Sequence, residues 1–302
     1  MTRAIKRNSI KRNYQLLLMV LGAMAFVFVF AYIPMYGVII AFQDYTPAFG
    51  IIDSPWVGME HFQRFFNNYR FETLLTNTFL LSFFGFVIGF PLPIILALLL
   101  NALRGERSKK IFQTIFYAPH FISVVVLVGM LYLFFGEYGL VNNILIALGA
   151  ERVSFFLEAG WFRPLFIGSG NWQNTGWSAI IYLAALSGVD PQLHESAMMD
   201  GASRFKRIRH IDLPAIYPTI SIILILSIGN LMSVGFEQVL LMQTGTNLET
   251  SEIISTYVYK TGIVDYEYSY AAAIGLFNSV INVVLLIIAN TSARKFSDNS
   301  LW

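Results

Sequence analysis

The residues Tyr14–Phe42 read YQLLLMVLGAMAFVFVFAYIPMYGVIIAF and contain no charged side chain. A helix of about 20 predominantly apolar residues is long enough to cross the hydrocarbon core of a bilayer. The run is too long for a secretory signal, and no small-residue cleavage site follows it. It therefore predicts a transmembrane helix near the start of the chain.

Five further runs have the same apolar character. The third run contains His120, the fourth is interrupted by Asn171, Gln173 and Asn174, and the fifth contains Glu237. Backbone polar groups find no water inside lipid, and runs this long and apolar exclude barrel strands. We therefore expect an all-α polytopic membrane protein whose six transmembrane helices cover residues 14–42, 73–101, 111–135, 164–189, 215–243 and 269–292.

The composition supports the same class of protein. The 302 residues are 56% hydrophobic and only 13% charged, with no cysteine and a mean hydropathy of +0.61. Soluble proteins carry about 25% charged residues, so this chain cannot cover a globular surface in water. The composition excludes a soluble enzyme domain and a disulfide scaffold. The net charge of +2 is also too small to indicate nucleic acid as a partner.

The distribution of basic residues predicts the orientation. Fifteen of the 20 Lys and Arg residues precede the first predicted span, follow the last, or lie in the loops after the second and fourth spans. Basic residues accumulate on the cytoplasmic side of membrane proteins. We therefore expect both termini in the cytoplasm, with an N-terminal segment 1–13, a transmembrane domain 14–292 and a tail 293–302.

Motifs of soluble catalysis are missing. There is no G-x-x-x-x-G-K-[ST] loop, no H-E-x-x-H motif and no G-x-S-x-G elbow. The four histidines fall in four different segments, which gives no metal-ligand spacing. We expect no catalytic residue, no metal and no cofactor in this chain, so transport through it would need a gradient or an energised partner.

One predicted cytoplasmic loop is more than a connector: residues 190–214, DPQLHESAMMDGASRFKRIRHIDLP. Asp190 followed by Pro191 predicts a helix that begins with a side-chain cap and proline at the first position. Gly201 predicts its end in the left-handed conformation. Such a short helix at the membrane surface fits the groove of a partner, and it fits equally an ordinary amphipathic surface helix with a basic flank.

The loop resembles the EAA loop of ABC importer permeases, whose pattern is E-A-A-x3-G-x9-I-x-L-P. The sequence departs from that pattern only at Ser196, where a small residue replaces another, and Asp200-Gly201-Ala202 is similar to the D-G-A of maltose-type sugar permeases. The resemblance implies that the loop couples to an ATPase through Glu195, Ser196, Ala197, Met198, Asp200, Gly201, Ile211, Leu213 and Pro214.

Other blocks resemble the oligosaccharide (multiple-sugar) branch of this family: residues 32–45, 54–62, 236–241 and 256–259. The family implies a type I importer permease fold in the inner membrane of a prokaryote. It also implies a second homologous permease subunit in a heterodimer, two ATPase subunits that bind ATP and Mg, and an extracytoplasmic solute-binding protein. The branch suggests an oligosaccharide substrate of uronic-acid type, while the lack of intramembrane Arg or Lys leaves a neutral sugar open.

A sugar site needs hydrogen-bonding groups and an aromatic face near the middle of the membrane. Asn174 and Trp177 are three residues apart and share a helix face. The fifth span is expected to place further candidates on one face, at offsets from the EAA loop that carry sugar contacts in maltose-type permeases. The full set of candidates is Gln173, Asn174, Trp177, Ser227, Asn230, Leu231 and Val234, with His120 and Glu237 as secondary candidates. The alternative is that these polar groups join helices within the bundle.

Two other functions compete with the permease reading. An ion-coupled secondary transporter of a small polar solute would need acids in the membrane, and Glu237 is the one acid in a predicted span. An intramembrane enzyme is opposed by the missing catalytic motifs.

Overall fold

The computed structural model describes residues 13–103 and 105–296, apart from the side chains of Lys295 and Phe296. Residues 1–12 of the predicted cytoplasmic segment, and residues 297–302 of the predicted tail, lie outside the described residues. Helices make up most of the described chain, and the one β-bridge in it joins Gln43 to Trp56. The all-α prediction is confirmed.

The described chain divides into two compact units, which we describe separately. The first contains the chain up to Asn67 together with Thr261–Leu276. The second contains Asn68–Lys260 and the chain from Phe277 onward. The last helix, α18 (Tyr268–Phe296), contributes residues to both.

The first unit contains one long exposed helix and a set of short polar contacts. The helix runs without a break through α2 (Tyr14–Val27), η1 (Phe28–Tyr32) and η2 (Ile33–Phe42). It is followed by α3 (Gly50–Asp53) and α4 (Glu60–Phe66). The backbone N–H of Tyr45 donates to Ser269 Oγ over 2.9 Å, and Arg64 pairs with Glu267 at 2.8 Å.

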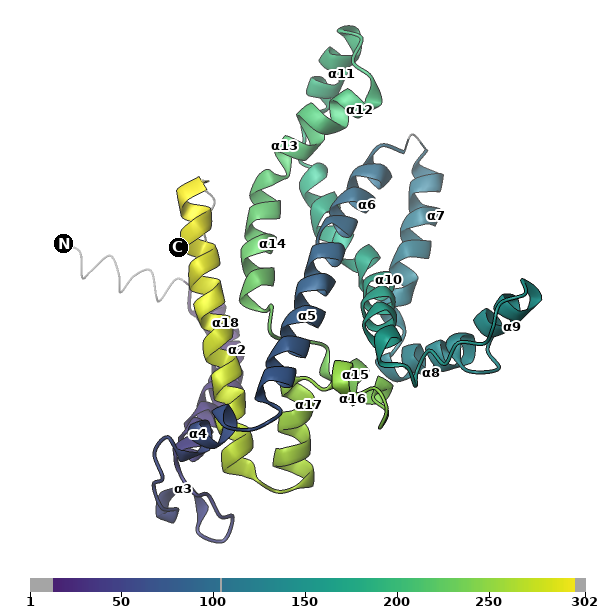
Figure 1. Ribbon diagram of the computed structural model, residues 1–302. Coiled ribbons are helices and arrows are strands. Elements are labelled where there is room, and N and C mark those ends of the chain that lie inside the picture. The colour runs from purple at the N-terminus through teal and green to yellow at the C-terminus, as the bar shows by residue number, and fades with distance from the viewer. Residues whose placement is uncertain (1–12, 104, 297–302) are drawn as a thin grey trace, which may run out of the picture. The chain divides into compact units, whose positions relative to one another are not determined.

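The second unit holds the remaining helices, together with the C-terminal part of α18. In chain order they are α5 (Phe71–Gly89), α6 (Pro91–Asn101), α7 (Glu106–Tyr117), η3 (Ala118–Phe121), α8 (Val124–Phe135), α9 (Leu140–Ala147), α10 (Ala159–Leu186), α11 (Pro191–Met199), α12 (Arg204–Arg207), η4 (Ile208–Asp212), α13 (Leu213–Ala215), α14 (Tyr217–Gly229), α15 (Phe236–Met242), α16 (Leu248–Ser251) and α17 (Ile254–Tyr259). The next element, η5 (Lys260–Val264), starts at the last residue of this segment and continues into the first unit. Figure 1 shows α11 and α12 at one end of this unit and α8, α15 and α16 at the other.

Four helices of the described chain are long and apolar enough to cross a membrane, judged by length and composition: Tyr14–Phe42, Phe71–Asn101, Val124–Ala147 and Tyr268–Arg294. Arg204–Ala215 and Tyr217–Gly229, bent by 60°, form a fifth if they are one span. The predicted fourth span, 164–189, overlaps α10 up to its last residue, Leu186, and α10 is an unbroken helix of 28 residues that carries the polar Asn171, Gln173 and Asn174. The count of six spans and the orientation stay predictions.

The predicted third span, 111–135, is wrong as a single helix. α7 ends at Tyr117, the short η3 contains Pro119, and α8 starts at Val124 after a cap in which Ser123 Oγ accepts from the N–H of Val126. Proline has no N–H to continue the helical ladder, which favours a break here. Figure 1 shows that α8 runs across the direction of α7.

The predicted fifth span, 215–243, is also wrong as a single helix. α14 ends at Gly229, and α15 begins only at Phe236. Asn282 of α18 holds the break, because its Oδ1 accepts from the N–H of Met232 over 3.0 Å and its Nδ2 donates to Ser233 Oγ over 3.3 Å. An amide side chain from another helix thereby replaces the helical hydrogen bonds lost at the break.

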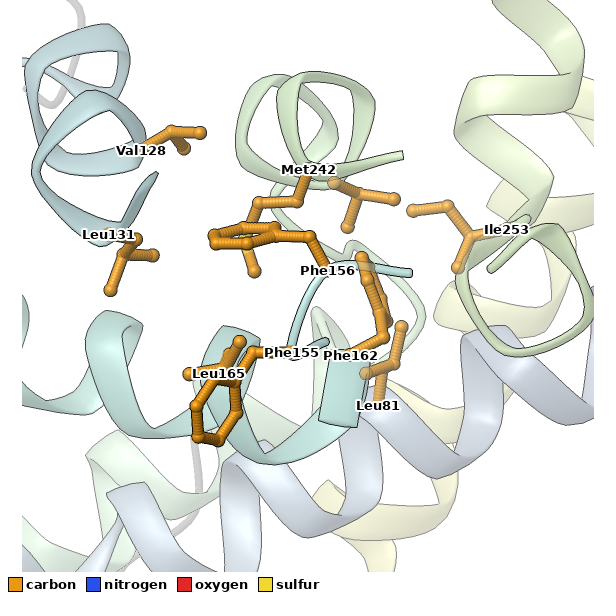
Figure 2. Close-up of a cluster of buried hydrophobic side chains, with 10 residues drawn as sticks. Leu81, Val128, Leu131, Phe155, Phe156, Phe162, Leu165, Met242 and Ile253 are labelled. Atoms are coloured by element: carbon orange, nitrogen blue, oxygen red, sulfur yellow. The ribbon is translucent and has the colours of Figure 1, made fainter. Parts of the chain in front are cut away.

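Two buried clusters hold the second unit together. One joins α5, α8, α10 and α15 through Leu81, Val128, Leu165 and their neighbours, with Phe155 and Phe156 of the loop before α10 at its centre (Figure 2). The other joins α6, α10 and the start of α14 through residues that include Ala97, Ala179 and Ile216. The first cluster lies toward the α8 and α15 end, and the second lies toward the 190–214 loop.

Candidate functional site

Three cavities share Asn174 of α10. Their volumes are about 510, 270 and 590 Å³, and Asn174 lines each of them. Trp177 lines the first and Ser227 the first and second. Asn230, Leu231 and Val234 line the second, and Gln173, His120 and Glu237 line the third. All nine residues singled out from the sequence therefore line one or more of three cavities that share Asn174.

His120 contacts both Asn174 and Trp177. Its imidazole stacks on the Trp177 indole, with ring centroids 4.5 Å apart and 7° between the planes. Its Nδ1 lies 3.2 Å from Asn174 Oδ1, and because an amide oxygen only accepts, Nδ1 donates. Trp177 remains 46% exposed. One face of the indole is thus covered by His120, and Phe121 contacts the ring edge-on, so that a part of the ring stays accessible for a ligand.

Gln173 has a structural contact of its own. Its side chain is buried, with 7% of the residue exposed, and Nε2 donates to the carbonyl oxygen of Ile122 over 2.7 Å. This bond holds the turn between η3 and α8, and so positions the adjacent His120. Of the polar candidates on α10, Asn174 is exposed and Gln173 is committed to the fold.

The expectation that Ser227, Asn230, Leu231 and Val234 share one helix face is wrong, because α14 ends at Gly229. Ser227 lies in the last turn of α14, and the other three lie in the break before α15. They still line the same cavity, because the chain in the break stays beside α5 and α10 residues such as Ser82 and Gly170.

Glu237 is exposed in the first turn of α15, where a carboxylate is favoured by the helix dipole. It lines the third cavity together with His120. Within the described residues, no lysine or arginine lines any of the three cavities. The cavities therefore offer amides, several hydroxyls, aromatic rings and one carboxylate.

The predicted shape of the 190–214 loop is confirmed. Asp190 Oδ1 accepts from the N–H of Gln192 over 2.9 Å, and Pro191 is the first residue of α11. Gly201 follows the helix with φ of +75°, in the left-handed region. The side chain of Ser203 then caps α12. Local capping rules thus account for the whole turn between α11 and α12.

The coupling candidates lie first on the exposed helix α11 and its end, and then on a segment that leads into α14. No residue of α11 is buried, and Glu195, Ser196 and Met198 are exposed, while Met199 beside them is 89% exposed. Asp200 and Gly201 form its exposed end. Ala197 is half-buried. Ile211, Leu213 and Pro214 lead into α14, and Leu213 packs on the second buried cluster.

His194, Asp212 and Asn101 form a polar cluster that no sequence motif predicts. His194 Nε2 lies 3.2 Å from Asp212 Oδ1, and Asn101 Nδ2 donates to the same oxygen over 3.3 Å. Asp212 is 4% exposed, and burial raises the pKa of its carboxyl, against the opposing effects of His194, Arg207 and Asn101. Asp212 is the variable position between Ile211 and Leu213 of the motif, so the pattern itself gave no reason to select it.

Comparison with known proteins gives consistent matches. The family model described as "Binding-protein-dependent transport system inner membrane component" matches residues 89–298. The polygalacturonan/rhamnogalacturonan transport system permease protein YteP of Bacillus subtilis is 44% identical, over 97% of this chain and 91% of its own length. Protein LplB of the same organism is 43% identical, over 97% of this chain and 93% of its own length.

Solved structures match the fold over nearly the whole chain. A crystal structure of a bacterial ABC transporter involved in the import of the acidic polysaccharide alginate superposes with a TM-score of 0.87 at 39% identity, covering 95% of this chain and 98% of that chain. A bacterial alginate ABC transporter in complex with alginate pentasaccharide-bound periplasmic protein gives 0.88 at 38% identity, covering 97% and 99%.

Proposed function

The chain belongs to the family of binding-protein-dependent transport system inner membrane components, and we propose that it forms, with a second homologous permease subunit, the sugar pathway of an ATP-driven importer. In this proposal the chain lies in the inner membrane of a prokaryote, with six spans and both termini in the cytoplasm. An extracytoplasmic binding protein delivers the substrate on the opposite side. The mechanism is alternating access, in which a two-state equilibrium is biased by partners.

The energy enters through the 190–214 loop. Two ATPase subunits bind ATP and Mg, and one of them receives α11 of this chain in a groove. Glu195 is the central residue, because it is exposed on α11 and has no ion-pair partner among the described residues, so that a basic side chain of the ATPase is free to pair with it. The chain itself carries out no chemistry in this proposal.

The substrate is an oligosaccharide of uronic-acid type. Relatives at 44% and 39% identity are named for polygalacturonan/rhamnogalacturonan and for alginate. The cavities around Asn174 contain amides and the accessible part of the Trp177 indole, which match sugar hydroxyls and C–H faces. Since no lysine or arginine lines them in the described residues, the pathway recognises rings and hydroxyls, and the binding protein selects the carboxylates.

The observation that carries the proposal is the convergence of Trp177, Ser227 and Asn230 on cavities that share Asn174. The test is reconstitution of the complex with its binding protein in proteoliposomes, using oligogalacturonate or oligoalginate and a neutral arabino-oligosaccharide as substrates. We expect uptake of an acidic oligosaccharide that requires ATP inside and binding protein outside. Uptake by the chain alone, driven by an ion gradient without ATP, would instead establish a secondary transporter.

A further inference from the structure

We propose that His194 and Asp212 form the link through which movement of α11 reaches the helices that line the sugar cavities. The inference rests on the proposed function, in which α11 docks into an ATPase. It assigns a positioning role to two residues outside the EAA pattern. His194 precedes Glu195 on α11, and Asp212 lies between Ile211 and Leu213.

Asp212 joins three segments that are far apart in the sequence. Its Oδ1 accepts from His194 of α11 and from Asn101, the last residue of α6. Asp212 is itself the last residue of η4, directly before the Leu213–Ala215 turn that leads into α14. One buried carboxylate therefore ties the exposed helix to the ends of two long helices.

The link is the polar side-chain attachment of α11. No residue of α11 is fully buried, and its apolar Leu193 and Met198 are 54% and 50% exposed. Among the described residues, the His194–Asp212 contact is the one side-chain hydrogen bond or ion pair that joins α11 to another helix. A force that the ATPase exerts on Glu195 is thus transmitted to Asp212 through the neighbouring His194.

The chemistry of Asp212 makes the link stiff. The carboxylate is 4% exposed, and burial is the largest influence on its pKa. A buried charge that loses its hydrogen-bond donors is strongly unfavourable, because the remaining group stays desolvated. A displacement of α11 that breaks the His194 contact leaves the buried carboxylate with Asn101 alone as a side-chain hydrogen-bond donor, and this loss favours movement of Asp212 together with α11.

The two helices attached at Asp212 reach the cavities. α14 carries Ile223 and Ser227, and α6 carries Pro93, all of which line the first cavity. α10, which the chain leaves immediately before α11, carries Asn174 and Trp177 on the same cavity. The link therefore connects the docking helix to α14, which contributes Ser227 to this cavity, while the chain itself joins α11 to α10.

The first test measures sugar moved per ATP hydrolysed by the reconstituted complex. His194→Ala removes the donor, and we expect the ATPase subunits to stay bound and hydrolysis to continue, while uptake per ATP falls about tenfold, within the range of typical coupling free energies. His194→Gln restores an N–H donor and should recover most of the ratio. His210→Ala is the matched control, because His210 lies on the same loop and bonds only to the carbonyl oxygen of Lys206 within its own segment.

The second test uses the absence of cysteine from the chain. In the double variant His194→Cys with Asp212→Cys, uptake per ATP should be low under reducing conditions and rise several-fold when a short thiol cross-linker joins the two positions. A protein that is only destabilised by these substitutions would not regain coupling on cross-linking. Failure of the two cysteines to cross-link would contradict the proximity on which the link rests.

The outcomes separate the link from the proposed function. If Glu195→Lys releases the ATPase subunits but His194→Ala leaves uptake per ATP unchanged, the link is refuted and the docking role of α11 stands. Release of the ATPase subunits by His194→Ala also refutes the link, because His194 would then act in docking. If Glu195→Lys leaves the subunits bound, the proposed docking of α11 itself is wrong.

Discussion

The imidazole of His120 lies parallel to the indole of Trp177, with 4.5 Å between the ring centroids, and its Nδ1 donates to Asn174 Oδ1. Phe121 meets the same indole edge-on, at 5.8 Å and 83°. Stacked and edge-on rings stabilise each other beyond their buried area. Trp177 is therefore held in one orientation before any ligand arrives, which reduces the entropy lost on binding.

Replacing the indole should impair transport without disturbing the ATPase. Trp177→Ala removes the accessible aromatic face, and we expect uptake to fall about two- to tenfold, since an aromatic contact contributes about 0.5–1.5 kcal/mol beyond its area. ATPase subunits should still copurify, and basal hydrolysis should persist. Trp172→Ala is the control, because Trp172 is exposed on the same helix and lines none of the three cavities. Equal losses in both variants would assign Trp177 to helix packing.

Asn230 should contribute through its amide. Asn230→Leu leaves a sugar hydroxyl without a partner, a loss of about 1–3 kcal/mol. Uptake measured across substrate concentrations should then show a higher half-saturation concentration with an unchanged yield of assembled complex. Normal uptake by this variant would place the substrate contacts elsewhere along the pathway.

Glu195→Lys should prevent docking. The exposed carboxylate becomes an ammonium facing the basic partner expected on the ATPase, and like charges across an interface cost several kcal/mol. We expect the ATPase subunits to be lost from the purified complex. Glu106→Lys is the matched control, because Glu106 is likewise an exposed helical glutamate, in the first turn of α7. The docking role fails if both variants retain the subunits.

Gly201 should matter through its backbone conformation. At φ of +75° a β-branched residue is strained, and Gly201→Val costs about 1–2 kcal/mol or more. The protein should insert and fold but fail to transport, because α11 points in the wrong direction. Gly201→Asn should retain activity, since asparagine tolerates the left-handed conformation. An active Gly201→Val variant would show that the turn is not needed.

Gly176 of α10 lies against the backbone of Phe116 in α7. A methyl group added there would collide with the carbonyl oxygen of Phe116. Gly176→Ala should lower the melting temperature of the detergent-solubilised complex, because overpacking costs about 1–3 kcal/mol. Gly168→Ala, on the same helix with nothing within 4 Å, should leave it unchanged or raise it. A Gly176→Ala complex as stable as the unaltered protein would mean that the helices separate at no cost.

Local sequence rules predicted the features that depend on near neighbours. Apolar runs identified the membrane class, because a helix in lipid satisfies its own backbone and needs only apolar side chains. The shape of α11 followed from Asp190, Pro191 and Gly201, because a cap involves residues only two or three positions apart. The pairing of Asn174 with Trp177 on one cavity followed from helical spacing alone.

Only the tertiary structure decided where the long apolar runs break and what lies behind the docking helix. Each break is held by an amide from a distant helix, Gln173 at Ile122 and Asn282 at Met232, and apolar periodicity contains no trace of such a partner. The contacts of Asp212 with His194 and Asn101 likewise join residues from separate segments. The physical reason is the same in each case, since a buried polar group must find a partner, and the fold rather than the neighbouring sequence determines which group is within reach.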